Sequence, residues 1–244
     1  MDGRSDGRTV GRWTRGWIAL GATVLLSVGP TVQPSGAQVG YDPGHSPYRD
    51  IRRGAVGVLA FGYLSGGRGS LGVGLADGAT AGIRYDAQFG AIGASLGLAY
   101  GRTQSFVVDP KKDSARTSGP YDNGVVLADA GLQLVLTGRK TWRGFAPYIG
   151  GALGVAFANT LAQDSSGYTF GTKFTLSPNA GVRWYPARRL SIRGDFRLVL
   201  WRLHYPLSYK VPPSGGGSSV LAPTAAITEW TSHRWATIGV AWTF

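Results

Sequence analysis

Beyond its first fifty residues, the chain alternates between apolar positions and polar or small positions with a period of two. In residues 173–185, for example, Phe174, Leu176 and Trp184 fall on one phase and Arg183 falls on the other. Such alternation is typical of β-strands that have one apolar and one polar face. The pattern therefore predicts an all-β protein.

Eight segments carry this pattern, and the connections between them alternate in length. The segments are residues 53–64, 79–89, 92–100, 126–136, 145–157, 173–185, 190–200 and 234–244. Short connections fall near Gly90 and at residues 138–144 and 186–189, and long ones fall at residues 65–78, 107–123, 159–171 and 205–228. Two features fit this scheme poorly: residues 53–64 are apolar or small on both faces, and Pro178 removes a backbone donor from its strand.

An even number of strands of about ten residues, joined alternately by short turns and long loops, is typical of a transmembrane β-barrel. A soluble eight-stranded barrel or a β-sandwich would show the same alternation, with its large apolar side chains inside. Two features favour the membrane: the polar phase is mostly small or charged, and aromatic residues gather near both ends of the apolar phase. Residues 52–244 are therefore predicted to form an eight-stranded antiparallel up-and-down transmembrane β-barrel.

The aromatic residues near the strand ends are predicted to form a girdle at each membrane interface. Toward the short turns these residues are Phe89, Phe145, Trp184, Trp242 and Phe244, and toward the long loops they are Tyr100, Phe157, Phe174 and Trp230. A soluble core gives no physical reason to sort aromatic side chains to two rims.

Charged residues on the small phase are predicted to face a narrow lumen. They are Arg84, Asp86, Asp129, Arg183, Arg193, Asp195 and Arg197. Because an unpaired buried charge is strongly destabilising, we expect an interlocked Arg–Asp network that closes the barrel to solutes larger than water or small ions. The alternative is a wet lumen in which these charges are only loosely paired.

The N-terminal segment has the composition of an export signal. A basic stretch precedes the apolar run at residues 17–28, and small residues at positions 35–37 offer a cleavage site. We therefore predict a signal peptide over residues 1–37 and a loose periplasmic lead-in over residues 38–51. A single anchoring helix is the alternative interpretation of the apolar run.

Two segments resemble small bacterial outer-membrane β-barrel proteins of the OmpA and OmpX type. They are the last strand, ATIGVAWTF at residues 236–244, and the hairpin GVRWYPARRLSIRGDFRL at residues 181–198. The resemblance implies that the chain is exported to the bacterial outer membrane. It also implies that Phe244, a terminal aromatic residue in an alternating strand, is recognised by the barrel-assembly machinery during insertion.

The formal charge of +12 raises the question of an anionic partner. The basic residues are scattered and no basic run is interleaved with aromatic residues, so nucleic-acid binding is not expected. Membrane lipid is the expected partner of the barrel wall, and the slightly basic loop at residues 109–123 is a candidate for contact with the phosphates of lipopolysaccharide. We expect the barrel to be a monomer.

The leading functional hypothesis is a non-enzymatic barrel whose loops serve envelope integrity, adhesion or partner binding. The alternative is a narrow porin-like pore for small ions or solutes. A lipid A-modifying enzyme would need a nucleophile and a base. Glu229, Thr231 and His233 share the lumen phase near the long loops, whereas His204 is predicted to face lipid and Ser208 lies in a loop. We expect no cofactor and no metal, because histidine is sparse, cysteine is absent and no phosphate-binding loop occurs.

Overall fold

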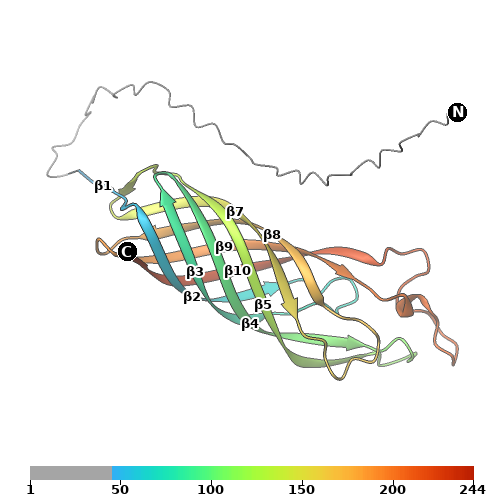
Figure 1. Cartoon of the computed structure of the whole chain (residues 1–244). Helices are drawn as coiled ribbons and strands as arrows, with labels where there is room; N and C mark the ends of the chain where they lie inside the picture. The colour runs from blue at the N-terminus through green and yellow to red at the C-terminus, as the bar shows by residue number, and fades with distance from the viewer. Residues whose placement is uncertain (1–45) are drawn as a thin grey trace, which may run out of the picture. The chain divides into compact units, whose positions relative to one another are not determined.

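Eight long antiparallel strands form a closed ring in the computed structural model, which describes residues 46–244 (Figure 1). The elements are β1 (Tyr48–Asp50), β2 (Gly54–Gly66), β3 (Gly78–Phe89), β4 (Ile92–Val108), β5 (Thr117–Val135), β6 (Lys140–Trp142), β7 (Phe145–Ala158), β8 (Gly171–Trp184), β9 (Leu190–His204), the 3-10 helix η1 (Leu207–Lys210) and β10 (Thr228–Thr243). Around the ring the order is β2, β3, β4, β5, β7, β8, β9 and β10, which confirms the predicted eight-stranded antiparallel up-and-down barrel. Within residues 46–244, no helix is long and apolar enough to cross a membrane.

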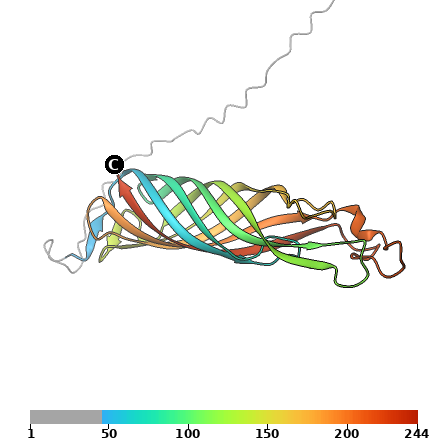
Figure 2. The same ribbon diagram turned by 90° about the horizontal axis from the view of Figure 1, so that it is seen from below.

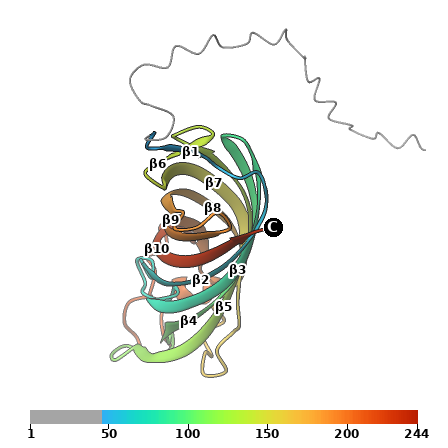
Figure 3. The same ribbon diagram turned by 90° about the vertical axis from the view of Figure 1, so that its left-hand side faces the viewer.

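The barrel has two unlike ends. The short connections after β3, β5 and β8 lie at one end together with β1, β6 and the C-terminus, and we refer to it as the turn end (Figure 3). The longer connections after β2, β4, β7 and β9 lie at the opposite end, the loop end. The β4–β5 hairpin and the β9–β10 connection reach farthest from the ring on that side (Figure 2).

Hydrogen bonds between the first and last long strands close the ring. β10 pairs with β2 over eleven consecutive positions. The pairing continues one residue further, because the Phe244 N–H donates to the Ala55 carbonyl at 2.9 Å. Closure gives the backbone groups of both edge strands a partner, which is a requirement for any sheet that contacts lipid.

Successive side chains point alternately into the lumen and away from it. In β2, the strand with the ambiguous pattern, Leu59, Phe61 and Tyr63 point outward and are about half exposed, whereas Val58 and Leu64 are buried. Composition cannot distinguish these two faces because both are apolar or small. The register with β3 and β10 fixes which face lines the lumen.

β8 runs through Pro178 without ending. Pro178 faces outward and pairs with Gly151 of β7. On the other side, the ladder between β8 and β9 is interrupted from Leu176 to Asn179. The missing N–H therefore breaks one ladder locally, and the second ladder holds the strand in the sheet.

The β4–β5 hairpin is longer than the sequence indicates. The prediction of a loop over residues 107–123 is wrong in extent, because β4 continues to Val108 and β5 begins at Thr117. The added part is polar on its outward face, as at Arg102 and Gln104. Antiparallel hydrogen bonds need no apolar face outside a core or membrane, so hydrophobic periodicity does not reveal this extension.

The end of the predicted loose lead-in is held by backbone pairing. β1 pairs with β6 of the β5–β7 connection, and the Ile51 N–H donates to the Arg139 carbonyl at 2.8 Å. Nothing in the composition of this segment signals these partners. The predicted signal peptide, residues 1–37, and the earlier part of the lead-in lie outside the described residues.

An engineered cysteine pair tests the closing register, because the chain has no native cysteine. Val58→Cys and Ala241→Cys occupy directly paired positions, whose α-carbons lie about 4.5–5.5 Å apart, a separation that a disulfide spans. Oxidation of the folded protein should yield a cross-linked form with altered mobility on a non-reducing gel.

The matched control joins Ala60→Cys to Ala241→Cys. Residue 60 is displaced by two positions along β2 from the partner of Ala241, which separates the α-carbons by about 7 Å or more. Cross-linking should fall sharply in this control. Equal cross-linking of both pairs would contradict the register.

Candidate functional site

One carboxylate, that of Asp86 on β3, contacts three arginine side chains in the turn-end half of the lumen. Arg84 Nε lies 2.9 Å from Asp86 Oδ1. Arg193 Nη1 of β9 donates to Asp86 Oδ2, and Arg183 Nη2 of β8 lies 3.8 Å from the same oxygen. All four side chains are buried. Because little water screens these charges, Asp86 ties β3 to β8 and β9 across the lumen.

A second carboxylate, that of Asp195 on β9, extends the network. Its Oδ1 accepts a hydrogen bond from Arg84 Nη1 at 3.3 Å and another from the Tyr148 hydroxyl. The Tyr148 ring also lies against two guanidinium groups, with the Cζ atoms of Arg183 and Arg193 at 4.7 and 5.6 Å from its centroid. Tyr148 therefore contacts Asp195 through its hydroxyl and two arginines through its ring face.

Two neutral side-chain amides accept hydrogen bonds from guanidinium N–H groups of the same arginines. Gln88 Oε1 accepts from Arg183 Nη1 at 2.7 Å. Gln133 Oε1 accepts from Arg183 Nη2 and from Arg193 Nη2, the latter at 3.4 Å. The Nε atoms of both arginines still lack a protein hydrogen-bond partner among residues 46–244. The network is thus densely paired but not fully satisfied by protein atoms.

A second, smaller group lies next to this network. Arg197 Nη1 of β9 donates to Asp129 Oδ2 of β5 at 2.9 Å, and the Arg197 Cζ lies 5.0 Å from the centroid of Trp235. The structure thus places each of the seven predicted lumen charges in an ion pair. They fall into two groups. The first, which we call the Asp86 group, consists of Arg84, Asp86, Arg183, Arg193 and Asp195, and within the described residues no ion pair joins it to Arg197 or Asp129.

Sequence reasoning did not include four large partners of these charges. They are Gln88, Gln133, Tyr148 and Trp235. All four lie on the lumen phase of their strands, which is the signal that would have found them. For Tyr148 and Trp235 this signal is obscured, because aromatic residues are otherwise typical of the outward phase.

Glycines at lumen positions make room for the larger side chains. A β-carbon on Gly181 of β8 would lie 2.5 Å from the Tyr148 hydroxyl oxygen. A β-carbon on Gly97 of β4 would lie 3.0 Å from a carboxylate oxygen of Asp129. The small residues that dominate this phase therefore determine where the charged and aromatic side chains fit in a narrow barrel.

The loop-end half of the lumen is filled by an apolar cluster rather than by charges. Its members from the strands include Leu64, Val125, Val199, Trp201, Leu203 and Trp235, and its members from the connections are Val73, Leu75, Tyr168, Phe170, Tyr205, Tyr209 and Leu221. Trp201 is fully buried, and the Phe170 ring packs edge-on against it, with 5.5 Å between the two ring centroids. The connections after β2, β7 and β9 therefore fold back over the lumen.

The three side chains considered for catalysis make separate contacts. The His233 ring is fully buried, and its centroid lies 4.0 Å from that of the Trp201 ring. Its Nε2 lies 3.2 Å from the Leu75 carbonyl oxygen. The Thr231 hydroxyl donates to the Trp201 carbonyl at 3.4 Å. In the described part of the chain, no hydrogen bond links either residue to Glu229. The arrangement lacks the nucleophile–base contact that acyl transfer requires.

Glu229 instead anchors the β2–β3 connection. Its carboxylate accepts from the Ser70 backbone N–H at 2.9 Å, the Ser70 hydroxyl at 2.8 Å and the Tyr205 hydroxyl at 2.6 Å. Burial, followed by the hydrogen bond to Glu229, raises the pKa of Tyr205 to about 12, so this hydroxyl remains a donor at neutral pH. Ser208 is engaged elsewhere, because its hydroxyl donates to the Ser166 carbonyl at 2.8 Å.

The described residues offer no evident metal site. His204 is exposed at the end of β9, and no group of three or more potential metal ligands occurs among residues 46–244. A small cavity adjoins the Asp129–Arg197 pair, with Thr80 and Trp235 in its lining. Its volume of about 30 Å³ has room for about one water molecule.

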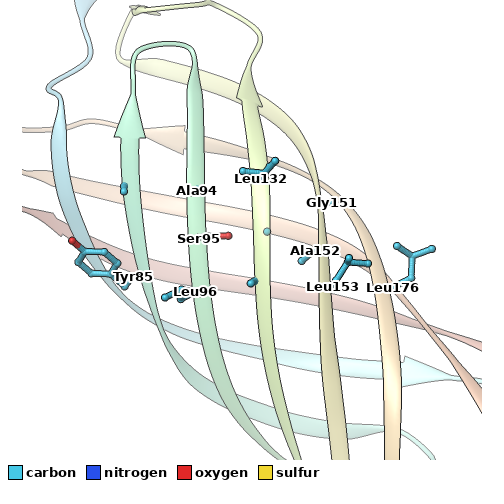
Figure 4. Close-up of a pocket in the computed structure, with 12 residues that line it drawn as sticks. Tyr85, Ala94, Ser95, Leu96, Leu132, Gly151, Ala152, Leu153 and Leu176 are labelled. Atoms are coloured by element: carbon cyan, nitrogen blue, oxygen red, sulfur yellow. The ribbon is translucent and has the colours of Figure 1, made fainter. Parts of the chain in front are cut away.

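The outer wall of the barrel is apolar. The nine aromatic residues predicted to form girdles are all exposed, from 42% for Phe157 and Trp184 to 69% for Phe89 and Phe244. Between them, leucines such as Leu96, Leu132 and Leu153 border a shallow groove across β3, β4, β5, β7 and β8 (Figure 4). No charged side chain lines this groove.

Comparison with family models and with curated proteins finds no match. Among solved structures, the chain is similar to the Neisserial surface protein A, with 15% identity, a TM-score of 0.48, and coverage of 82% of this chain and 98% of that one. It is also similar to the N-terminal β-barrel domain of Pseudomonas aeruginosa OprF, with 13% identity, a TM-score of 0.42, and coverage of 79% and 98%. The Yersinia pestis outer membrane protein Ail gives 14% identity, a TM-score of 0.37, and coverage of 78% and 99%.

Removing one member of the Asp86 group should destabilise the barrel strongly. Arg193→Ala leaves Asp86 buried with fewer counter-charges, and breaking a buried ion pair from one side costs about 3–5 kcal/mol. We expect a loss of this size in the free energy of unfolding, measured by denaturant titration of the refolded protein with tryptophan fluorescence.

The matched control is Arg188→Ala, which removes an exposed arginine from the β8–β9 turn. Its unfolding free energy should change by no more than about 0.5 kcal/mol. Equal losses in the two variants would mean that the lumen charges do not stabilise the fold.

Proposed function

We propose that this chain is a non-enzymatic bacterial outer-membrane barrel with a closed lumen. The barrel anchors the exposed connections at its loop end in the membrane. One observation carries the proposal: the outer wall of the barrel is apolar, and the paired charges of the strands lie inside. Leu132 on the outer wall is 64% exposed, whereas Arg193 in the lumen is 1% exposed. In water this arrangement would be unfavourable, and in a bilayer it is the favourable one.

The dimensions of the apolar wall support the membrane location. Phe145 and Phe157 mark its two edges on β7, and both point outward. Twelve steps at about 3.4 Å each, tilted by about 40°, span about 31 Å along the barrel axis. This distance between the two girdles is enough to enclose the apolar band of about 25 Å that outer-membrane barrels present to lipid. Beyond the band, outward positions such as Arg102 and Gln104 are polar.

The side chains that fill the lumen favour the function of a closed anchor over that of an open pore. The Asp86 group occupies the turn-end half, and the apolar cluster around Trp201 occupies the loop-end half. A solute would have to displace a paired ionic network and then cross a packed aromatic cluster. The separate contacts of His233, Thr231 and Glu229 likewise give no support to a lipid-modifying enzyme.

The surface that such an anchor presents lies on two connections at the loop end. The tip of the β4–β5 hairpin, residues 109–116, contacts the β9–β10 connection through a hydrogen bond from Arg116 to the Ser218 carbonyl. Lys111 and Lys112 on this tip are exposed. We propose that this surface serves adhesion, partner binding or envelope integrity, with lipopolysaccharide phosphates as candidate ligands of the lysines.

An arginine on the outer wall tests the proposal. Leu132→Arg should lower the free energy of unfolding in lipid vesicles by about 2–4 kcal/mol, because a charge at mid-bilayer depth is costly. The same substitution would be nearly neutral if this wall faced water. The measurement is a urea titration in vesicles, with the shift between unboiled and boiled gel mobility as the test of folding.

The matched control is Gln104→Arg, which places the same side chain on the outward face of β4 beyond the apolar band. It should leave the unfolding free energy within about 0.5 kcal/mol of the unmodified protein. A neutral result for Leu132→Arg as well would rule out the membrane-spanning function.

A further inference from the structure

The turn end gathers eight basic side chains that are scattered in the sequence. They are Arg49, Arg52, Arg53, Arg139, Lys140, Arg143, Arg188 and Arg189, and all are exposed. They lie on three segments, residues 49–53, 139–143 and 188–189, in which Asp50 is the one acid. The loop end differs, because there acids are interspersed and pair with bases, as in Lys112–Asp109 and Arg116–Asp113.

Hydrogen bonds hold the three basic segments together. Pairing of β1 with β6 sets Arg49 opposite Thr141, and the Arg143 N–H donates to the Pro47 carbonyl at 2.8 Å. The β8–β9 turn joins them, since the Tyr185 N–H donates to the Gly144 carbonyl at 2.8 Å. The positive charge at this end is therefore a fixed feature of the fold, and we name these eight side chains the basic rim.

A hollow lies within the basic rim, between β1 and the β8–β9 turn. Arg49, Arg52 and Arg188 line it together with Asp50, Thr141 and Tyr185, and its volume is about 760 Å³. Among residues 46–244, no carboxylate lies within ion-pair distance of any rim side chain. Three guanidinium groups against the single carboxylate of Asp50 give the lining of the hollow a net positive charge, which suits a phosphate, an anion that arginine binds through two parallel hydrogen bonds.

The rim borders the aromatic edge of the outer wall. Trp142 is 48% exposed, and the Arg143 Cζ lies 5.3 Å from its ring. Phe145 and Trp184 stack next to them, with ring centroids 6.3 Å apart. Exposed tryptophans mark the depth of lipid head groups, so the basic side chains beside them lie at the level of the phosphates.

We propose that the basic rim binds the phosphate groups of anionic phospholipids in the leaflet that surrounds the turn end, with one head group held in the Arg49–Arg52–Arg188 hollow. The inference rests on the proposed insertion into a membrane. A membrane phospholipid is favoured over a soluble anion, because the charge is distributed around the barrel mouth directly beside the lipid-facing aromatic residues. Basic clusters next to a membrane span attract anionic lipid in the same way.

Brominated lipids provide the test, since bromine on the acyl chain quenches nearby tryptophan fluorescence. Trp230→Phe removes the outward-facing tryptophan toward the loop end, so that the outward-facing tryptophans left among residues 46–244 are Trp142, Trp184 and Trp242. The full chain is folded into mixed vesicles of phosphatidylglycerol and phosphatidylcholine, with one of the two lipids brominated. We expect stronger quenching by brominated phosphatidylglycerol, equivalent to about a threefold preference.

A charge-matched pair of variants locates the binding site. Replacing Arg49, Arg52 and Arg188 by glutamine should lower the preference to about twofold or less, because five rim bases remain, and about 1 M NaCl, which screens exposed charges, should reduce it to about onefold. Replacing the exposed loop-end residues Arg68, Arg102 and Arg202 by glutamine removes the same charge and should leave the preference unchanged. The rim residues are exposed, and the gel-mobility shift confirms that each variant is folded.

Four outcomes would overturn the inference. They are equal quenching by both lipids, a preference insensitive to salt, equal loss in the loop-end variant, and loss of the preference in inorganic phosphate at matched ionic strength, which would indicate a site for free phosphate. Failure of the proposed function looks different, because without membrane insertion neither brominated lipid would quench.

Discussion

The contact of Asp86 with three guanidinium groups is the interaction on which the rest of the barrel depends. The interior of a ring of eight strands is just wide enough for side chains to fill it, so a charge inside it needs a partner among the other lumen side chains. Asp86 pairs with Arg84 on its own strand and with Arg183 and Arg193, and so joins β3 to β8 and β9 across the lumen. Gln133 and Tyr148 add β5 and β7 to the same group.

This internal pairing allows the outer wall to remain free of charge. The wall presents leucines and aromatic residues on its outer face, whereas paired ions fill one end of the lumen and the Trp201 cluster fills the other. The two ends of the barrel then differ in chemistry. The loop end carries mixed charges on the β4–β5 hairpin, beside connections that fold back over the lumen, and the turn end carries the basic rim. The same ring of strands thus determines the positions of the outer wall, the loop-end surface and the basic rim.

Strand positions, the outward phase and the seven lumen charges could be predicted from the sequence, because alternation with a period of two follows directly from the environment on each side of the wall. Other features could not. The β4–β5 hairpin extends beyond the apolar band, where pairing leaves no hydrophobic signature. Tyr148 and Trp235 resemble wall residues by composition. The basic rim combines residues about 90 positions apart in the chain, as in Arg49 and Arg139, and only the pairing of β1 with β6 brings them together.

Single-channel conductance of the refolded protein in a planar bilayer tests the central claim of a closed lumen most directly, once a gel-mobility shift has established that the protein is folded. We expect membranes that remain silent over the range of voltages the bilayer withstands, because the Asp86 group and the Trp201 cluster block the path in series. Stable, reproducible conductance steps would contradict the closed lumen and would favour a narrow pore.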